Sequence, residues 1–361
     1  MSSTTSQVHV DLGSRAYDIE IGQRSLGGLG SFVRNRGDVT HAVLITDENV
    51  QEPHAADAAD SLCAEGIEVD MIVVPPGETT KSIDIAAGLW EGMLDLKADR
   101  KSVVVAVGGG VVGDLAGFVA ATFARGVRFF QVPTSLLAQV DSSVGGKVGI
   151  NLPEAKNMVG AFLQPTGVFI DTATLDTLEL REYRAGLGEV VKYGVILDAD
   201  FFRFLEANVE ELRRRDYEVL TQVVARCCRL KADVVERDEF ETTGLRAILN
   251  YGHTFAHAYE TLAGYGEIVH GEAVAMGMRR AALLARRMDL VDDAFVERQQ
   301  SLMDALELRS EPPEFEPDRL LDAMRRDKKV AHGKLRFILP HEIGKVELTS
   351  DVEEENLRAV L

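Results

Sequence analysis

Polar residues in the second half of the chain recur at the spacing of one helical face. Steps of four, three, four and three separate Arg246, Asn250, His253, His257 and Glu260. Such steps place side chains on one side of a helix, although Gly252 lowers the helix propensity of this segment. Imidazoles and carboxylates are zinc ligands, and His270-Gly271-Glu272 follows a glycine-containing loop. The pattern predicts a helix over 246–260 whose stripe, with the loop histidine, binds a metal or an anionic ligand.

Simpler explanations compete with this prediction. A lone His-x-x-x-His pair more often consists of partly exposed histidines with ordinary hydrogen bonds. Glu189 and Lys192, three residues apart, would most simply form a surface ion pair. Their flanks are apolar, however, and a buried charge needs a partner or a metal. The companion residues therefore favour a metal or an anionic ligand.

A glycine-rich turn in the first half is typical of phosphate binding. Gly108, Gly110 and Gly113 follow the apolar run Val103–Val107 and satisfy G-x-G-x-x-G, which lets backbone N–H groups approach a pyrophosphate at a helix start. The acid expected about 20 residues later in a Rossmann unit is absent between 114 and 141. Asp47 could serve the ribose instead, or be a turn residue. Residues 76–81 are either a nucleotide contact or a helix-capping turn.

Other features exclude several classes of function. Asp141–Lys147 only superficially resembles a P-loop, because Asp141 and Val148 break the Walker pattern. The formal net charge of −19 disfavours nucleic acid and anionic membranes as partners, but not a small anionic substrate. Three cysteines without C-x-x-C spacing suggest neither a disulfide framework nor a thiolate zinc site. With no signal peptide or apolar run of about 18 residues, we expect a soluble cytoplasmic protein.

Alternating strands and helices must position these residues. Short apolar strands are predicted at 8–10, 17–21, 41–46, 69–74, 103–107, 129–132 and 168–170, with helices at 55–64 and 82–96. Such alternation indicates a parallel sheet. From residue 175 the pattern is mostly helical, with a short strand at 335–339. We therefore expect an α/β nucleotide-binding domain at 1–182, a mainly α-helical metal- and substrate-binding domain at 183–361, and an active site in the cleft between them.

Taken together, the motifs resemble the 3-dehydroquinate synthase family of the sugar phosphate cyclase superfamily, over nearly the whole chain. The markers are Gly108–Asp114, Arg125-Gly126, Pro133–Leu137, Asp141–Lys147, Lys156-Asn157, Gly188–Lys192, Leu249–Thr254 and His270–Glu272. So many matches in order are far more specific than any one of them. Ser135 stands where the family commonly has a second Thr, a change that keeps the hydroxyl.

The resemblance implies a role for each group of residues. Metal ligands, normally for zinc with cobalt possible, would be Glu189, His253 and His270. Contacts with NAD would come from Asp47, Gly77, Glu78, Thr79, Thr80, Lys81, Gly110, Val111, Val112, Gly113, Asp114, Thr134, Ser135, Lys147 and Lys156, and more weakly from Thr174, Leu175, Asp176 and Thr177. Substrate-binding or catalytic residues would be Arg125, Asp141, Lys147, Lys156, Asn157, Lys192, Lys231, Arg246, Asn250 and His257. Lys328 or Lys329 could close the site, and a homodimer is implied.

The activity that the resemblance implies is conversion of 3-deoxy-D-arabino-heptulosonate 7-phosphate to 3-dehydroquinate and phosphate. It combines transient oxidation by NAD, phosphate elimination, re-reduction, ring opening and aldol closure, so NAD is regenerated in each turnover. Asp141 could relay a proton or cap the turn at Ser142-Ser143. Three alternatives stay open: a cyclase for another sugar phosphate, a metal-dependent polyol dehydrogenase that releases NADH, and a noncatalytic nucleotide sensor. Arg246, Asn250 and His257 favour a substrate with a carboxylate.

Overall fold

The computed structural model describes residues 5–153, 155–264, 266–326 and 335–361. The chain forms two compact units. The first unit contains Met1–Leu178 and Tyr217–Phe240, and the second contains Glu179–Asp216 and Glu241–Leu361. The sequence placed a single boundary after residue 182, whereas the structure groups residues 217–240 with the N-terminal part.

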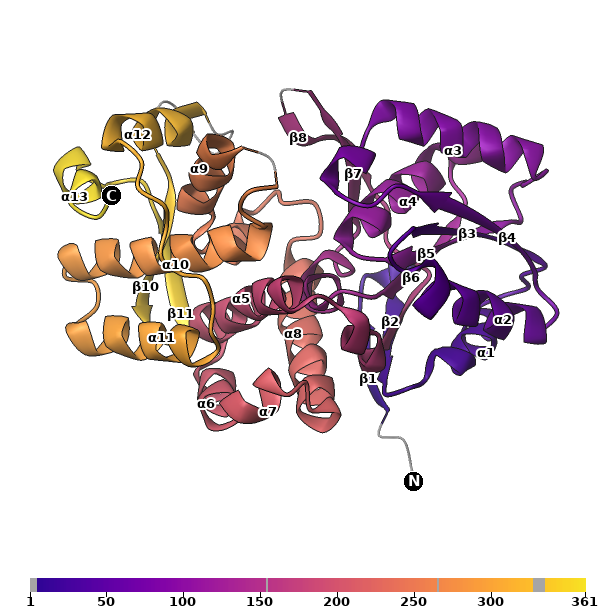
Figure 1. Ribbon diagram of the computed structural model, residues 1–361, viewed down its shortest axis with the longest axis horizontal. Helices are drawn as coiled ribbons and strands as arrows, with labels where there is room; N and C mark the ends of the chain where they lie inside the picture. Colours follow the sequence, from indigo (N-terminus) through magenta and orange to yellow (C-terminus); the bar gives the residue numbers. More distant parts are fainter. Residues whose placement is uncertain (1–4, 154, 265, 327–334) are drawn as a thin grey trace. The chain divides into compact units, whose positions relative to one another are not determined.

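The first unit is built on a seven-stranded sheet (Figure 1). The strand order is β1-β2-β9-β6-β5-β3-β4, and all pairs are parallel except the edge hairpin β1–β2. The expected parallel sheet is therefore confirmed. Its strands are β1 (Ser6–Val10), β2 (Tyr17–Gly22), β3 (His41–Asp47), β4 (Glu68–Val74), β5 (Val103–Gly108), β6 (Arg128–Pro133) and β9 (Gly167–Asp171).

Helices cover both faces of this sheet because strand side chains alternate between the faces. Val43 and Ile45 of β3 pack with helices α3 (Ile83–Asp95) and α4 (Gly110–Thr122). Ala42 and Leu44 pack instead with α1 (Leu29–Arg34) and α2 (Ala56–Ala64). A strand buried on both faces reads as a continuous apolar run, which explains why these strands were visible in the sequence.

A second hairpin, β7 (Lys147–Leu152) with β8 (Ala155–Phe162), was not expected from the sequence. It packs on α4, where a side-chain Cβ at Gly117 would lie 2.3 Å from Val148. The register of the hairpin shifts between Ile150 and Leu152. Glycines and charged residues interrupt its apolar pattern, which is why no strand was predicted there.

Short 3-10 and π turns connect the regular elements. They are η1 (Gly13–Arg15), η2 (Leu26–Gly28), η3 (Gln51–Ala55), η4 (Glu78–Thr80), η5 (Phe123–Arg125), η6 (Ala138–Ser142), η7 (Thr172–Thr177) and η8 (Leu245–Asn250). Several of them follow strands of the sheet directly. They carry many of the candidate cofactor residues.

Helix α8 (Tyr217–Arg237) belongs to the first unit because it packs on β1, β2, η6 and η7. The backbone N–H of Asp11 donates to Glu236, which also accepts a hydrogen bond from Arg229. The α8 helix thus covers the antiparallel edge of the sheet and brings Lys231 into the first unit.

Thiol reactivity should report this packing. Cys227 and Cys228 of α8 are fully buried, whereas Cys63 on α2 is exposed. Burial raises the pKa of the Cys228 thiol to about 12, and the thiolate is the reactive form. We therefore expect a thiol-specific reagent at neutral pH to modify Cys63 alone in the native protein and all three cysteines after unfolding. Rapid modification of Cys228 in the folded protein would contradict the described packing.

The second unit is mainly helical, as expected. Its helices are α5 (Leu180–Leu197), α6 (Ala199–Ala207), α7 (Val209–Arg213), α9 (His253–Ala263), α10 (His270–Arg287), α11 (Asp293–Ala305), α12 (Pro317–Arg326) and α13 (Glu354–Arg358). Helix α10 packs against α5, α9 and α11 and against β10 (Phe337–Glu342), which pairs antiparallel with β11 (Lys345–Thr349). None of the described helices is long and apolar enough to span a bilayer.

Glycines let the backbones of α5, α9 and α10 approach one another closely. A Cβ at Gly271 would lie 2.0 Å from the Ala185 carbonyl oxygen, so α10 and α5 touch there through their main chains. A Cβ at Gly277 would lie equally close, 2.0 Å, to the Gly252 carbonyl oxygen just before α9. Larger side chains would separate the helices. The two contacts fix the positions of three helix segments that carry candidate ligands.

Candidate functional site

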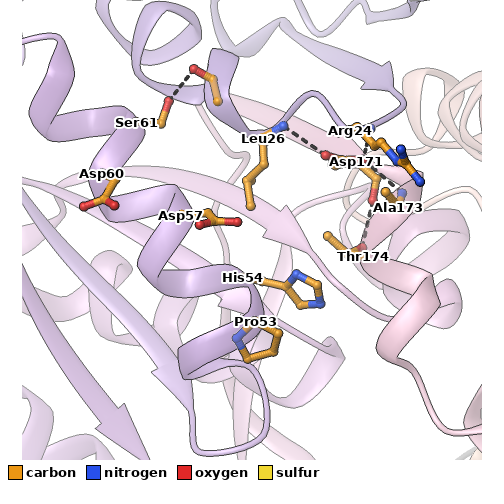
Figure 2. A pocket seen from close by; sticks show the side chains of 11 residues that line it. Arg24, Leu26, Pro53, His54, Asp57, Asp60, Ser61, Asp171, Ala173 and Thr174 are labelled. Atoms are coloured by element: carbon orange, nitrogen blue, oxygen red, sulfur yellow. Dashed lines mark hydrogen bonds between the residues drawn. The ribbon is translucent and has the colours of Figure 1, made fainter.

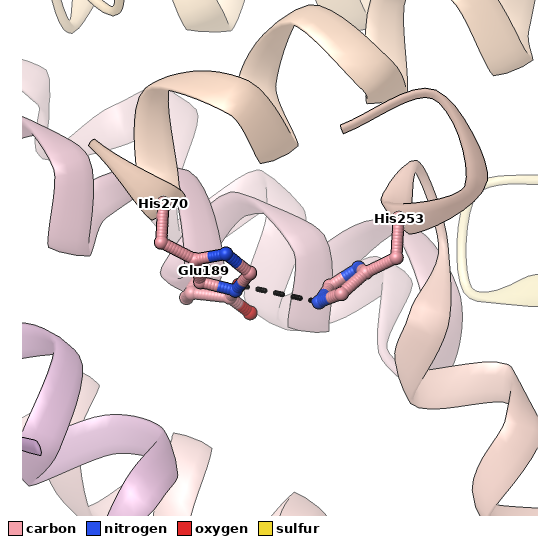
Figure 3. Close-up of side chains that lie close together, drawn as sticks. All are labelled: Glu189, His253 and His270. Atoms are coloured by element: carbon pink, nitrogen blue, oxygen red, sulfur yellow. Dashed lines mark ion pairs between the residues drawn. The ribbon is translucent and has the colours of Figure 1, made fainter. Parts of the chain in front are cut away.

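Three side chains from three helices of the second unit converge on one point (Figure 3). Glu189 comes from the middle of α5, and His253 and His270 are the first residues of α9 and α10. One potential ligand atom of each lies within 4.8 Å of the others. Glu189 and His253 are buried, and His270 is half-buried. The structure thus brings together all three residues that the resemblance implied as metal ligands.

The geometry of this cluster fits a divalent ion. Oε1 of Glu189 lies 3.9 Å from Nε2 of His253 and 3.8 Å from Nε2 of His270. These separations are too long for hydrogen bonds. Atoms that are each about 2.0–2.2 Å from a tetrahedral ion lie roughly 3–4 Å from one another. Two imidazoles and one carboxylate are also a known zinc-binding set that leaves a coordination position open for a substrate.

Glu189 and Lys192 form an ion pair inside the second unit. Oε2 of Glu189 contacts Nζ of Lys192, and only 1% and 2% of the two side chains are exposed. The simpler prediction of a surface ion pair is therefore wrong, because the apolar flanks of both residues turn this face of α5 inward. A buried carboxylate without compensation would be costly. Lys192 provides that compensation on one oxygen and leaves the other oxygen facing the histidines.

The predicted continuous helix over 246–260 is wrong. Arg246 and Asn250 lie in the 3-10 turn η8, and α9 begins only at His253. Gly252 has a positive φ of 81°, which interrupts the helix and which a residue with a side chain rarely adopts. The spacing rule holds only within α9, where the rings of His253 and His257 are 5.7 Å apart.

Arg246 is nevertheless part of the interior of the second unit. Its side chain is 3% exposed, and Nε lies 3.7 Å from the Glu241 carboxylate. Sequence reasoning missed Glu241, because its position in an acidic, turn-rich segment gives no periodic signal. Asn250 and His257 are half-buried. The second unit thus holds the candidate ligands together with four of the candidate substrate residues.

The first unit forms the predicted glycine turn at the carboxyl end of β5. Strand β5 ends at Gly108, Gly109 caps the following helix, and α4 starts at Gly110. The backbone N–H of Thr134 donates to the Gly108 carbonyl, so the segment after β6 lies beside the turn. A Cβ at Gly110 would lie 3.0 Å from the Ser142 hydroxyl. The main-chain N–H groups that open α4 are the expected donors to a phosphate.

Other candidate cofactor residues form turns at the same edge of the sheet. Asp47 accepts a hydrogen bond from the Asn49 backbone N–H, and burial raises the pKa of its carboxyl group. Asp47 therefore acts as a turn residue in the structure, and its contact with ribose stays a prediction. Residues 78–80 form a 3-10 turn, and Ser82 rather than this segment caps α3. Lys81, 4% exposed, donates to Asp114 at 2.6 Å.

Asp141 lies in the first unit with three of the candidate lysines, Lys147, Lys156 and Lys231, on different elements. Nζ of Lys231 donates to the Asp141 carbonyl at 2.7 Å and lies 3.1 Å from its carboxylate. Lys147 starts β7, and Lys156 and Asn157 lie on β8. Arg125, by contrast, follows α4 at the end opposite the glycine turn, about 20 Å away for a helix of this length. The chain therefore does not bring Arg125 to the turn.

A cavity of about 480 Å³ borders the last group of cofactor candidates (Figure 2). Thr174 of η7 lines it together with Arg24 and His54. His54 also bonds Thr177 through Nε2, and burial lowers the pKa of its imidazole. The nearby Asp171 carboxylate accepts from four backbone N–H groups, so its role is to hold the loops. Leu175 is buried and Asp176 exposed. Lys328 and Lys329 lie outside the described residues.

Comparison with known proteins identifies the family. Family models described as the N-terminal and C-terminal parts of 3-dehydroquinate synthase match residues 71–185 and 186–330. A 3-dehydroquinate synthase of Rhodopirellula baltica is 49% identical over 367 residues, covering 100% of this chain and 98% of the relative. The chain belongs to the 3-dehydroquinate synthase family.

Solved structures of other cyclases also resemble this member of the 3-dehydroquinate synthase family. A 2-deoxy-scyllo-inosose synthase complexed with carbaglucose-6-phosphate, NAD+ and Co2+ has a TM-score of 0.89 and 29% identity, covering 98% of this chain and 99% of that chain. A 2-epi-5-epi-valiolone synthase from Streptomyces hygroscopicus with NAD+ and Zn2+ bound has a TM-score of 0.87 and 26% identity, covering 95% of each chain.

The sequence of this 3-dehydroquinate synthase family member did not show which groups contact the second ring nitrogen of each candidate histidine ligand. The Nδ1 of His253 donates to the Tyr251 carbonyl at 3.1 Å, which leaves Nε2 facing Glu189. The Nδ1 of His270 lies 3.5 Å from the Glu260 carboxylate. Such partners fix the tautomer and orientation of a ligating histidine. The helical stripe contained Glu260, but its spacing alone did not reveal the residue that it faces.

Removal of this carboxylate should weaken metal binding without abolishing it. We expect Glu260→Ala to lower zinc affinity about 10- to 100-fold, because His270 would lose its orienting partner. Glu260→Gln should have a smaller effect, since its amide oxygen can still accept from Nδ1–H. Competition titration with a zinc chelator measures both variants. Equal affinity of wild type and Glu260→Ala would exclude this role.

Proposed function

We propose that the chain converts 3-deoxy-D-arabino-heptulosonate 7-phosphate to 3-dehydroquinate and phosphate. The observation that carries this proposal is the convergence of Glu189, His253 and His270 in the second unit. A separate observation supports it: the glycine turn of the first unit has main-chain donors that suit a dinucleotide pyrophosphate. The proposal is further supported by curated relatives at 43–49% identity over nearly the full chain that carry the name of this enzyme.

The proposed cofactors are NAD+ and one divalent metal ion, most simply zinc. Bound NAD+ would take up and return a hydride, while a bound zinc ion would act as a Lewis acid that increases the acidity of a substrate hydroxyl. The net reaction needs no external oxidant, because the substrate is oxidised and then reduced in one turnover. We also propose a cytoplasmic homodimer.

The cationic side chains of the chain would bind the two anionic groups of the substrate. Lys192 compensates the charge of Glu189, and its ammonium can also donate to a substrate hydroxyl. Arg246 offers the planar donor set that carboxylates and phosphates accept, and Asn250 and His257 of the same unit would add further contacts. Lys147, Lys156 and Asn157 of the β7–β8 hairpin would contribute further contacts. Fixed charges of this kind stabilise developing negative charge without reorganisation.

Lys231 and Asp141 would take part in proton transfer near the reacting carbon atoms of the substrate. Their ion pair in the first unit holds the carboxylate in place, so the group could relay a proton through a hydroxyl or water. The leaving phosphate itself is our proposed acceptor of the proton lost during elimination. His257 would then hold that phosphate rather than act as the base.

Phosphate release tests substrate, cofactor and metal together. We expect phosphate to appear from the heptulosonate phosphate only when NAD+ and metal are present, with no net rise in the near-ultraviolet absorbance of NADH. Chelator treatment should stop the reaction, and zinc should restore it. Accumulation of NADH without phosphate would instead indicate a polyol dehydrogenase. Binding of NAD+ with no turnover of the heptulosonate phosphate would reject the proposal.

Sugar phosphates without a carboxylate separate this activity from that of other cyclases. Glucose 6-phosphate and sedoheptulose 7-phosphate carry the phosphate but leave a carboxylate-binding cation unpaired. An unpaired buried polar group discriminates strongly against such analogues. We expect kcat/KM for both to be lower by at least about 10³-fold. Comparable rates with either sugar would identify a different cyclase.

A further inference from the structure

Asn151 joins the predicted cofactor loop to the predicted substrate hairpin, although nothing in the motifs assigned it a role. Its Nδ2 donates to the Glu78 carboxylate at 2.7 Å. Its Oδ1 accepts from the backbone N–H of Asn157 at 2.8 Å. Its own backbone N–H donates to the Lys81 carbonyl at 2.8 Å. A single residue at the end of β7 therefore contacts both ends of the 78–81 turn and the opposite strand.

The chemistry of the partners fixes the orientation of the Asn151 amide. A carboxylate can only accept and a backbone N–H can only donate. The amide therefore has one orientation that satisfies both neighbours, and no residue with a single type of polar group could replace it. Aspartate would keep the bond to Asn157 but would place a negative charge against Glu78.

The contact with Asn157 lies at an irregularity of the hairpin. Ile150 pairs with Val159 and Leu152 pairs with Ala155, so one residue of β7 faces the segment 156–158 of β8. Asn157 has a positive φ of 54° there. Bulges re-aim side chains and leave ladder groups without their usual partners. Asn151 supplies a partner for the freed Asn157 N–H and so holds the bulge that carries Lys156 and Asn157.

The Lys81 ammonium joins the same segments through a second set of hydrogen bonds. Nζ of Lys81 donates to the Asn157 side-chain oxygen as well as to Asp114 of the glycine turn. The cofactor loop, the first turn of α4 and the bulge of β8 are thus joined by hydrogen bonds through Lys81 and Asn151. A change in the position of one of these segments changes the bonds that the others can make.

We propose that Asn151 is a positioning residue that couples binding of NAD+ to binding of the sugar acid phosphate. The proposal rests on the proposed function, because it takes residues 78–81 as a cofactor loop and Lys156 and Asn157 as substrate contacts. Occupancy of either segment fixes the bridge and lowers the cost of ordering the other. Coupling of this kind is reciprocal and commonly amounts to 5- to 150-fold in affinity.

Reciprocal substitution at this bridge tests the proposal. We expect Asn151→Asp to raise the Kd for NAD+ about tenfold, the usual order for loss of a hydrogen bond to a charged group. The double variant Asn151→Asp with Glu78→Gln exchanges donor and acceptor and should recover most of that loss relative to Glu78→Gln alone, a reference that removes any direct contact of Glu78 with NAD+. Leu152→Ala, at an exposed neighbouring side chain, is the control for disturbance of the hairpin and should bind NAD+ like wild type.

Calorimetry on chelated protein measures these constants without turnover. Titration of NAD+ with and without the heptulosonate phosphate gives the coupling ratio, which we expect to fall towards about 1 in Asn151→Asp and to return in the double variant. In metal-loaded enzyme, KM should rise more than kcat falls. An unchanged Kd and coupling ratio in Asn151→Asp, or no recovery in the double variant, would overturn the proposal. Wild-type protein that does not bind NAD+ would instead reject the proposed function.

Discussion

Replacement of His253 with alanine is expected to remove the metal and the catalytic activity together. Its Nε2 is one of three donor atoms that lie within 4.8 Å of one another, and its Nδ1 is held by the Tyr251 carbonyl. Loss of a direct ligand should weaken metal binding by more than the 10–100-fold that loss of an orienting partner causes. Without Lewis-acid assistance, we expect kcat to fall by at least about 10³-fold.

Metal content and phosphate release should be measured on the same preparation of His253→Ala. His257→Ala is the matched comparison, because its ring lies on the same face of α9, 5.7 Å from that of His253, but outside the set of three. We expect His257→Ala to keep its metal and to lose substrate affinity. A stoichiometric metal content together with normal turnover in His253→Ala would remove this histidine from the ligand set.

A single methyl group on Gly271 should destabilise the second unit and disturb its metal centre. An alanine Cβ there would lie 2.0 Å from the Ala185 carbonyl oxygen, a main-chain atom that cannot rotate away. Helices α5 and α10 would have to separate, which we expect to cost about 3 kcal/mol of unfolding free energy. Glu189 and His270 lie next to this contact on the two helices, so separation should also lower the affinity for zinc.

Gly88→Ala provides the control for Gly271→Ala. Gly88 lies within α3, and a Cβ there would meet no atom within 4 Å. Alanine should stabilise that helix by up to about 1 kcal/mol. Urea denaturation and zinc titration of both variants measure the two effects. If Gly271→Ala were as stable and as well loaded with zinc as wild type, the backbone contact would not be what positions the ligands.

Local patterns predicted the sheet well because its strands are buried on both faces. The run Val103–Val107 and the run from His41 to Thr46 were visible as apolar segments, and the alternation with helices indicated their parallel order. The glycine turn after β5 was visible for the same reason, since the three glycines follow a buried strand directly. The grouping of candidate ligands, however, rested on family resemblance, because Glu189 lies on a different helix from either histidine.

What the sequence did not reveal depends on contacts between distant segments. The helix over 246–260 was overpredicted because spacing cannot show that Gly252 adopts a positive φ against α10. The β7–β8 hairpin was missed because its glycines serve close packing, as at Gly149 and Gly160, and so interrupt the apolar pattern. Glu241 and Asn151 gave no signal, and the spacing that included Glu260 did not show its partner His270, since each acts on a residue that only the fold brings near.

The return of the chain in α8 affects how the first unit can form during synthesis. The N–H of Asp11 donates to Glu236, 225 residues later, so one edge of the seven-stranded sheet stays uncovered until the ribosome has synthesised α8. At the usual speed of translation this delay is roughly 10 to 45 s. The nascent edge strands are uncovered for that time, and we expect chaperones to bind them because unpaired strand edges are prone to association. A gene fragment that stops after residue 182 would express an open, association-prone sheet instead of an independent cofactor module.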